Sequence, residues 1–170
     1  MEKDRTFTLS NGVEIAFRVV RPDDAGALQR VHAQCSECTI YLRFFGSLEK
    51  LSDQQAQYFA STDGVDHLGL VALDPQDSNE IIAVARYARE AFDERAEYAT
   101  LVEDRWQGHG VGAELTRRLI EQARDNGVRS FYALVKGKNK SMLSVLRHLD
   151  LPEQERVEEG EKLVEVELAS

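Results

Sequence analysis

Three glycines at alternate positions mark the segment of this sequence most suited to chemistry. Gly108, Gly110 and Gly112 lie between a predicted strand and a predicted helix. Glycine has no Cβ, so the chain can turn tightly there and a ligand can approach the backbone closely. The free N–H groups and the positive dipole end of the following helix favour an anion. The segment therefore predicts a binding site for a phosphate or pyrophosphate.

Three other interpretations of this loop have to be weighed. A nucleotide P-loop ends in Gly-Lys-Ser/Thr, but Gly112 is followed by Ala113 and Glu114, which excludes that motif. A dinucleotide fingerprint can be matched as Gly108-x-Gly110-x-x-Ala113, but too little chain follows for the remaining strands of that fold. The third alternative is a glycine-rich turn that binds nothing.

The hydropathy pattern predicts the elements that position this loop. Asn11-Gly12 between the alternating runs 6–9 and 13–20 predicts a hairpin. Further strands are predicted at 68–73, 81–87, 97–102, 131–135, 156–158 and 163–168, with a turn-rich loop at 74–79. Helices are predicted around 27–31, at 52–60, from the glycines to Asn126-Gly127, and at 139–149. This order predicts a single mixed α/β domain.

The composition narrows the class of protein. A chain of 170 residues with 42% apolar residues suits one globular domain. The charged N-terminus has no signal-like stretch, and no apolar run approaches the roughly 20 residues that cross a bilayer, so a cytoplasmic protein without a membrane partner is expected. The net charge of -9 argues against nucleic acid and is compatible with a cationic partner.

The two cysteines form one C-x-x-C motif, Cys35 to Cys38, with His32 three residues upstream. A structural zinc site needs four ligands and no second pair is present, so no metal is expected. A redox motif favours the start of a helix beside a strand, whereas this one falls near a predicted helix end. Two reduced thiols are therefore expected.

A family resemblance follows from the loop and its surroundings. Gln107-x-x-Gly110-x-Gly112 matches the Q/R-x-x-G-x-G/A signature of the GNAT superfamily of N-acetyltransferases, and Trp106 falls where the family often has an aromatic residue. Asn139 falls where the family often has an Asn at the start of the next helix. The resemblance implies one GNAT-like domain over residues 1–170. Its central, mostly antiparallel sheet would have about seven strands and about four flanking helices.

Two short segments narrow the resemblance within that superfamily. Tyr41-Leu42-Arg43-Phe44-Phe45 resembles the R-F-F segment of bacterial protein lysine acetyltransferase domains. Asn139-Lys140-Ser141-Met142 resembles their N-x-x-M. An aromatic turn packed into the core is an equal alternative for the first segment.

The resemblance implies acetyl-CoA as the co-substrate, with no metal. Leu101 and Val102 would face the pantetheine arm, and Asn139 would also contact the coenzyme. The residues implied to hold the pyrophosphate are Gln107, Gly108, His109, Gly110, Val111 and Gly112. His109 can equally be an exposed loop residue without a role.

The resemblance also implies a mechanism of direct transfer to a primary amine. Glu97 matches the family's catalytic glutamate and would take the amine proton, with Glu103 in reserve. The alternative for Glu97 is the solvated start of an edge strand. Leu146 occupies the position of the usual general-acid Tyr. Protein lysine is the favoured acceptor. A small-molecule amine, or a non-catalytic acyl-CoA-binding regulatory domain, is the alternative, and an exposed strand edge would permit a homodimer.

Overall fold

The computed structural model describes residues 5–36, 40–42, 46–135, 145, 147–158 and 161–168. The strands are β1 (Arg5–Thr8), β2 (Glu14–Val19), β3 (Ile40–Leu42), β4 (Gly46–Leu48), β5 (His67–Asp74), β6 (Asp77–Ala88), β7 (Arg95–Val102), β8 (Ser130–Val135), β9 (Glu153–Glu158) and β10 (Glu161–Glu167). The helices are α1 (Ala25–Ala33), α2 (Asp53–Ala60) and α3 (Val111–Asp125), with short 3-10 turns η1 (Pro22–Asp24) and η2 (Asp104–Trp106). None of these helices has both the length and the apolar character needed to cross a membrane.

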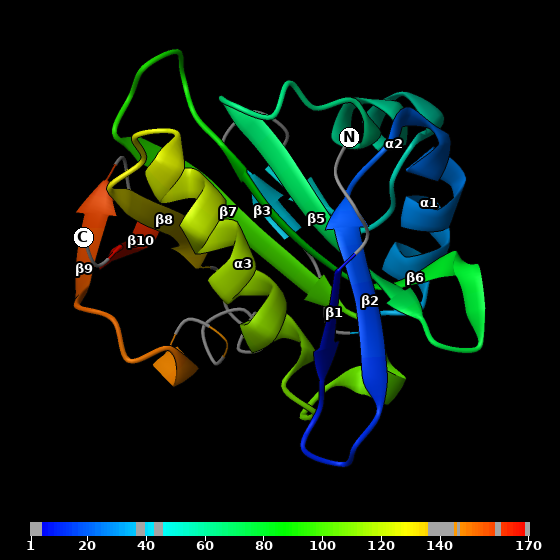
Figure 1. The fold of residues 1–170 in the computed structure, drawn as a ribbon. Helices are drawn as coiled ribbons and strands as arrows, with labels where there is room; N and C mark the ends of the chain where they lie inside the picture. The colour runs from blue at the N-terminus through cyan, green and yellow to red at the C-terminus, as the bar shows by residue number, and fades with distance from the viewer. Residues whose placement is uncertain are drawn as a thin grey trace.

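Eight strands form one twisted sheet in the order β1-β2-β5-β6-β7-β8-β10-β9 (Figure 1). Every neighbouring pair is antiparallel except β7 and β8, which run parallel. The predicted fold class, a mostly antiparallel sheet with flanking helices, is confirmed. The strand count is eight where about seven were expected. Most of the helix predicted at 139–149 lies outside the described residues, and residues 145, 147 and 148 are helical.

Two hairpins show how local sequence sets the turns. In the first, Gly12 has φ +87° and the backbone N–H of Val13 donates to Oδ1 of Asn11, as the Asn-Gly pair predicted. In the second, the predicted six-residue loop is wrong, because β6 begins already at Asp77. The carboxylate of Asp74 accepts the N–H of Gln76, so polar residues there close a tight turn with an irregular register.

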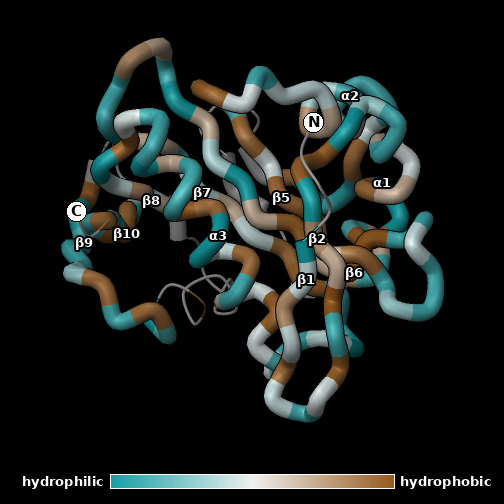
Figure 2. The backbone as a smooth tube through the Cα atoms, viewed as in Figure 1, coloured by the Kyte–Doolittle hydropathy of each residue, from teal (hydrophilic) through white to brown (hydrophobic). Residues whose placement is uncertain are grey.

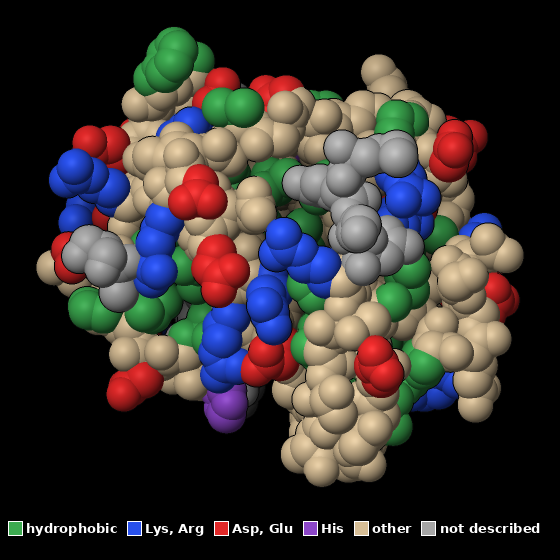
Figure 3. Space-filling model, in the orientation of Figure 1, with side chains coloured by type: hydrophobic (Ala, Val, Ile, Leu, Met, Phe, Trp, Pro, Cys, Tyr) green, Lys and Arg blue, Asp and Glu red, His purple; other side chains and the backbone are tan. Residues whose placement is uncertain are grey.

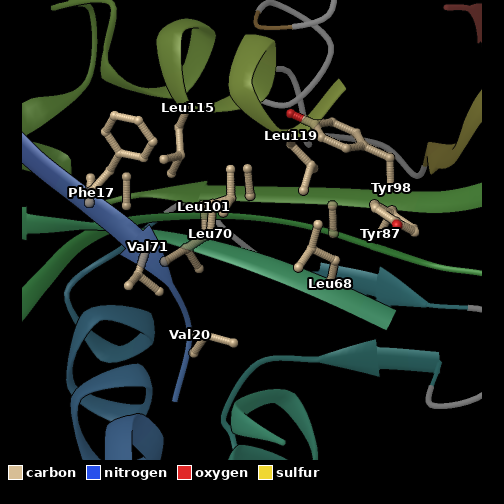
Figure 4. Packing of buried hydrophobic residues seen from close by; sticks show 14 of the residues in the cluster. Phe17, Val20, Leu68, Leu70, Val71, Tyr87, Tyr98, Leu101, Leu115 and Leu119 are labelled. Carbon is tan, nitrogen blue, oxygen red and sulfur yellow. The ribbon is translucent and has the colours of Figure 1, made fainter. Parts of the chain in front are cut away.

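The core lies on both faces of the sheet. α3 covers one face and α1 and α2 cover the other (Figures 1 and 4). The helical spacing of Val111, Leu115 and Leu119 is confirmed, since all three are buried beneath α3. Figure 2 shows the same division, with hydrophobic segments along the central strands and hydrophilic ones on loops and outer helix surfaces. Figure 3 shows acidic and basic side chains interspersed over the outward surface of α3.

One polar pair is sealed into the α3 face. The Tyr98 hydroxyl lies 2.6 Å from Oγ1 of Thr116, and the Tyr98 ring stacks on Phe131. Burial raises the pKa of Tyr98 to about 12, so this phenol stays protonated at neutral pH. The hydrogen bond explains how Thr116 can be fully buried within an apolar helix face.

The strands β7 and β8 separate after a short paired region. Arg95, Ala96 and Glu97 pair with residues 130–132 of β8. β7 then continues to Val102 and β8 to Val135 without further pairing between them. The carboxyl-terminal half of β7 therefore presents a backbone edge toward β8, and the glycine loop begins where that edge ends.

We predict that Leu119→Ala lowers the free energy of unfolding by roughly 2–5 kcal/mol, because it leaves a cavity under α3. Urea denaturation followed by circular dichroism measures this loss. Glu121→Ala, at an exposed position of the same helix, is the control and should change stability by less than about 0.5 kcal/mol. Equal losses in the two variants would contradict the packing of α3 described above.

Candidate active site

The glycine loop adopts the geometry that its sequence predicted. Gly108 has φ +78° and Gly110 has φ +87°, both in the left-handed region that other L-residues adopt only with strain. Gly110 is the N-cap of α3 and has no side chain to cap the first helical turn. That turn therefore presents uncapped N–H groups.

The backbone amides of the loop are also available. Within the described part of the chain, Gly108, His109 and Gly110 donate no backbone hydrogen bond. Uncapped amides at a helix N-terminus form an anion site. Gln107 anchors the loop to the end of β7, because its side-chain Nε2 donates to the Val102 carbonyl at 3.0 Å.

A cleft of about 320 Å³ opens beside this loop. It is lined by Thr100, Val102, Trp106, Gln107, Gly108, Gly110, Val111, Gly112, Ala113, Val145 and His148. At Gly112 a Cβ atom would lie 3.1 Å from side-chain carbons of both Val102 and Val145. Glycine therefore lets these three residues approach closely where they line the cleft.

The structure brings together most of the predicted coenzyme residues. Val102, Gln107, Gly108, Gly110, Val111 and Gly112 all line the cleft. His109 lies outside that lining and has its ring 6.3 Å from the Trp106 ring, and the Leu101 side chain points to the opposite face of β7. Asn139 and Leu146 lie outside the described residues. Nothing in the sequence assigned His148 a role, and it was interpreted as an ordinary helix residue, yet its i+3 spacing from Val145 places both on one helix face beside the cleft.

The opposite face of β7 carries Glu97, Ala99 and Leu101 at alternate positions. Leu101 and Ala99 border an apolar cavity of about 40 Å³ between the sheet and the helices α1 and α2. Glu97 is 8% exposed, and β7 lies inside the sheet between β6 and β8. The alternative that Glu97 is the solvated start of an edge strand is therefore wrong.

Two further polar residues share this face: His67, interpreted from the sequence as an ordinary strand residue, and Arg86, which the sequence did not single out. A guanidinium nitrogen of Arg86 on β6 lies 2.9 Å from Nε2 of His67 on β5, and the same guanidinium stacks 4.2 Å over the ring of Phe59. Burial, with the charge of Arg86, lowers the pKa of His67 to about 4. Burial lowers the pKa of Arg86 to about 10. At neutral pH the histidine is therefore neutral and the arginine charged.

Glu103, the reserve base, is engaged at the other end of β7. Its carboxylate is 5% exposed and accepts from Nε of Arg105 at 2.5 Å. That ion pair lies at the start of the glycine loop. It ties Arg105, at the entry to the loop, to the residue that follows β7.

The segment after α1 is tied to the same loop. The backbone N–H of Ser36 donates to the Asp104 carboxylate at 3.0 Å, and Gln107 Nε2 lies 3.8 Å from Sγ of Cys35. Cys35 is disulfide-bonded, so the prediction of reduced thiols is wrong for this residue. Cys38 lies outside the described residues. Among the described residues no group of three His, Cys, Asp or Glu could hold a metal.

Comparisons with known proteins identify the family of this chain. The model of the acetyltransferase (GNAT) family matches residues 36–150. The chain belongs to the GNAT acetyltransferase family. The crystal structure of the GNAT domain of S. lividans PAT superposes with a TM-score of 0.81 at 31% identity, covering 97% of both chains.

Two sequence relatives extend the comparison. An acetyltransferase of Pseudomonas aeruginosa is 28% identical over 136 residues, which cover 79% of this chain and 73% of that protein. Acetyltransferase Pat of Mycolicibacterium smegmatis is 34% identical over 138 residues, covering 78% of this chain and 40% of Pat. The chain therefore spans less than half the length of that relative.

Membership of the GNAT family makes the chain an acetyl-CoA-dependent acetyltransferase, as the loop signature predicted. The cleft fits that co-substrate on its own geometry. Free amides and a helix N-terminus suit a pyrophosphate, and the open edge of β7 offers backbone groups to an amide-containing chain.

We predict that Gly110→Ala weakens acetyl-CoA binding at least about tenfold. Alanine at the φ of Gly110 is strained by about 1–2 kcal/mol, and relief of that strain would turn the backbone amides of the loop away from the coenzyme. Isothermal titration calorimetry measures the dissociation constant. Gly64→Ala is the matched control, with φ +76° and, like Gly110, no atom within 4 Å of the added Cβ. The two variants should lose similar stability, but only Gly110→Ala should lose affinity for acetyl-CoA. Equal affinities of the two variants would refute the role of the loop.

Proposed function

We propose that this GNAT enzyme transfers the acetyl group of acetyl-CoA directly to a primary amine, with Glu97 as general base and protein lysine as the preferred acceptor. The observation that carries the proposal is the burial of Glu97 on β7, on the face of the sheet opposite the coenzyme cleft. It is the last β7 residue paired with β8, at the point where the two strands separate.

The chemistry requires a base at such a point. A lysine ammonium has a pKa of about 10.4, so at neutral pH the reactive free amine is a minor species. A positioned carboxylate removes the proton as the nitrogen attacks, and such catalysis contributes about 10²–10⁴ in rate. Glu97 lies on the face that carries α1 and α2, which leaves the other face to the coenzyme.

The coenzyme contacts are proposed from the same geometry. The amides of the loop from Gln107 to Gly112 would hold the pyrophosphate, and the backbone edge at Leu101 and Val102 would pair with the pantetheine arm. His109 and Asn139 complete the proposed set. A backbone N–H near the separation of the strands would stabilise the developing oxyanion, a contribution of a few kcal/mol.

Protein lysine is favoured over a small amine by similarity. The segments at 41–45 and 139–142 resemble bacterial protein lysine acetyltransferases, and relatives named PAT or Pat match most of this chain. A small-molecule amine acceptor and a non-catalytic coenzyme sensor are the outcomes that the experiments below distinguish.

We predict that Glu97→Gln lowers kcat by roughly 10²–10⁴-fold and leaves acetyl-CoA affinity unchanged, because the amide cannot accept the proton. Release of the coenzyme thiol, followed with a chromogenic disulfide, gives kcat on a lysine peptide. Glu103→Gln tests the rival carboxylate, which is equally buried. A larger kcat loss in Glu103→Gln would move the base to the glycine loop.

Parallel assays with a lysine peptide library and with polyamines distinguish the acceptor classes. A higher kcat/KM on lysine peptides than on polyamines supports protein lysine as the acceptor. Turnover on polyamines alone would make a small-molecule amine the acceptor instead. Saturable acetyl-CoA binding without turnover on either would establish a coenzyme sensor instead.

A further inference from the structure

A buried arginine faces Glu97 from the neighbouring strand. In the β6–β7 register Arg86 lies opposite Ala99, and Ala88 lies opposite Glu97. Arg86 and Glu97 are therefore diagonal neighbours on one face of the sheet. Each is 8% exposed, so water screens their charges weakly.

The other contacts of Arg86 leave its charge unmatched. Its NH2 group meets a neutral His67 ring, its guanidinium lies over Phe59, and its Nε has no hydrogen-bond partner in the described part of the chain. Burial disfavours the charged guanidinium and lowers the pKa of Arg86, and Tyr58 on α2 and then Glu97 oppose that effect. Glu97 is the carboxylate of these two groups.

Further titratable groups lie around Glu97 and Arg86. Arg95 is two residues before Glu97 on β7, Tyr132 on β8 pairs with Glu97, and Glu165 on β10 pairs with Tyr132. His67 on β5 and Tyr58 on α2 lie near Arg86. Arg95 also carries a positive charge, and its Nε lies 3.1 Å from the Glu165 carboxylate. Arg86 is the cation on the neighbouring strand β6 whose charge acts on Glu97.

We propose that Arg86 is a positioning residue that keeps the Glu97 carboxylate ionised, and so able to accept the proton of the amine at neutral pH. This inference rests on the proposed role of Glu97. A nearby positive charge favours the ionised carboxyl, which opposes the effect of burial. A base works only in its ionised form, so Arg86 sets the pH at which activity falls on the acid side.

The test is the pH dependence of kcat for Arg86→Gln on a lysine peptide. Glutamine can keep a hydrogen bond to His67 but carries no charge. In the pH profile of kcat, the fall in activity on the acid side (the acid limb) should move to higher pH by about one unit or more, because loss of the positive charge favours the protonated carboxyl. At pH 6 the loss in kcat should reach about tenfold, with recovery to within about threefold at alkaline pH. A loss of kcat by the same factor at every pH would reduce Arg86 to a structural residue and overturn the inference.

Two further variants separate the possible failures. Arg89→Gln removes another buried arginine, 3% exposed and paired with Asp66, and should leave the acid limb in place. Glu97→Gln should remove the limb that Arg86→Gln moves and leave only the rise of activity toward the amine pKa of about 10.4. Persistence of the lower limb in Glu97→Gln would overturn the proposed base itself, whereas a lower limb that vanishes there and is unmoved in Arg86→Gln would overturn only the role of Arg86.

A thermal double-mutant cycle gives a readout that needs no acceptor. If the two charges interact, the Tm loss of Arg86→Gln with Glu97→Gln at pH 7 should be smaller than the sum of the single losses by a few degrees. Additive losses would contradict the interaction. Circular dichroism confirms that each variant is folded before its activity is measured.

Discussion

The separation of β7 from β8 is the constraint on which the rest of the site depends. Parallel strands normally continue their hydrogen bonds along their length, but here three residues of β7 pair and the following five leave the ladder. Unpaired backbone groups inside a sheet are costly unless something else satisfies them. A ligand rich in amide groups, lying along the open edge, would meet that requirement, which is why the fold and the co-substrate agree.

The alternation of β7 places different side chains on the two faces of the sheet. Thr100 and Val102 face the cleft beside α3, whereas Glu97 and Leu101 face α1 and α2. A shift of one residue in the β6–β7 register would exchange these faces and bring Glu97 beneath α3. The register is fixed on the α3 side by Tyr98, whose ring stacks on Phe131 and whose hydroxyl meets Thr116. The core beneath α3 therefore keeps the Glu97 side chain on the face of α1 and α2.

Local sequence was sufficient to predict the features that depend on neighbouring residues. The Asn11-Gly12 hairpin, the glycine loop and the buried stripe of α3 were all found from spacing alone. The separation of β7 from β8 could not be found this way, because β8 begins 28 residues after β7 ends and only the assembled sheet sets where pairing stops. His67 and Arg86 were missed for the same reason, since the antiparallel register of two long strands brings them together. The loop at 74–79 was overestimated because its Asp and Asn residues, typical of loops, also close tight turns.

The cluster around Arg86 is difficult to explain by stability. A buried charge carries a desolvation penalty of several kcal/mol, and apolar side chains of the same volume often give equal or greater stability. Phe59 and a neutral His67 soften that penalty without cancelling the charge. An apolar replacement would pack as well against α2, yet it would leave Glu97 in an apolar environment that favours the protonated carboxyl. If Arg86 has the proposed role, the arrangement accepts a loss of stability in order to hold the Glu97 carboxylate in the charged form that a base needs.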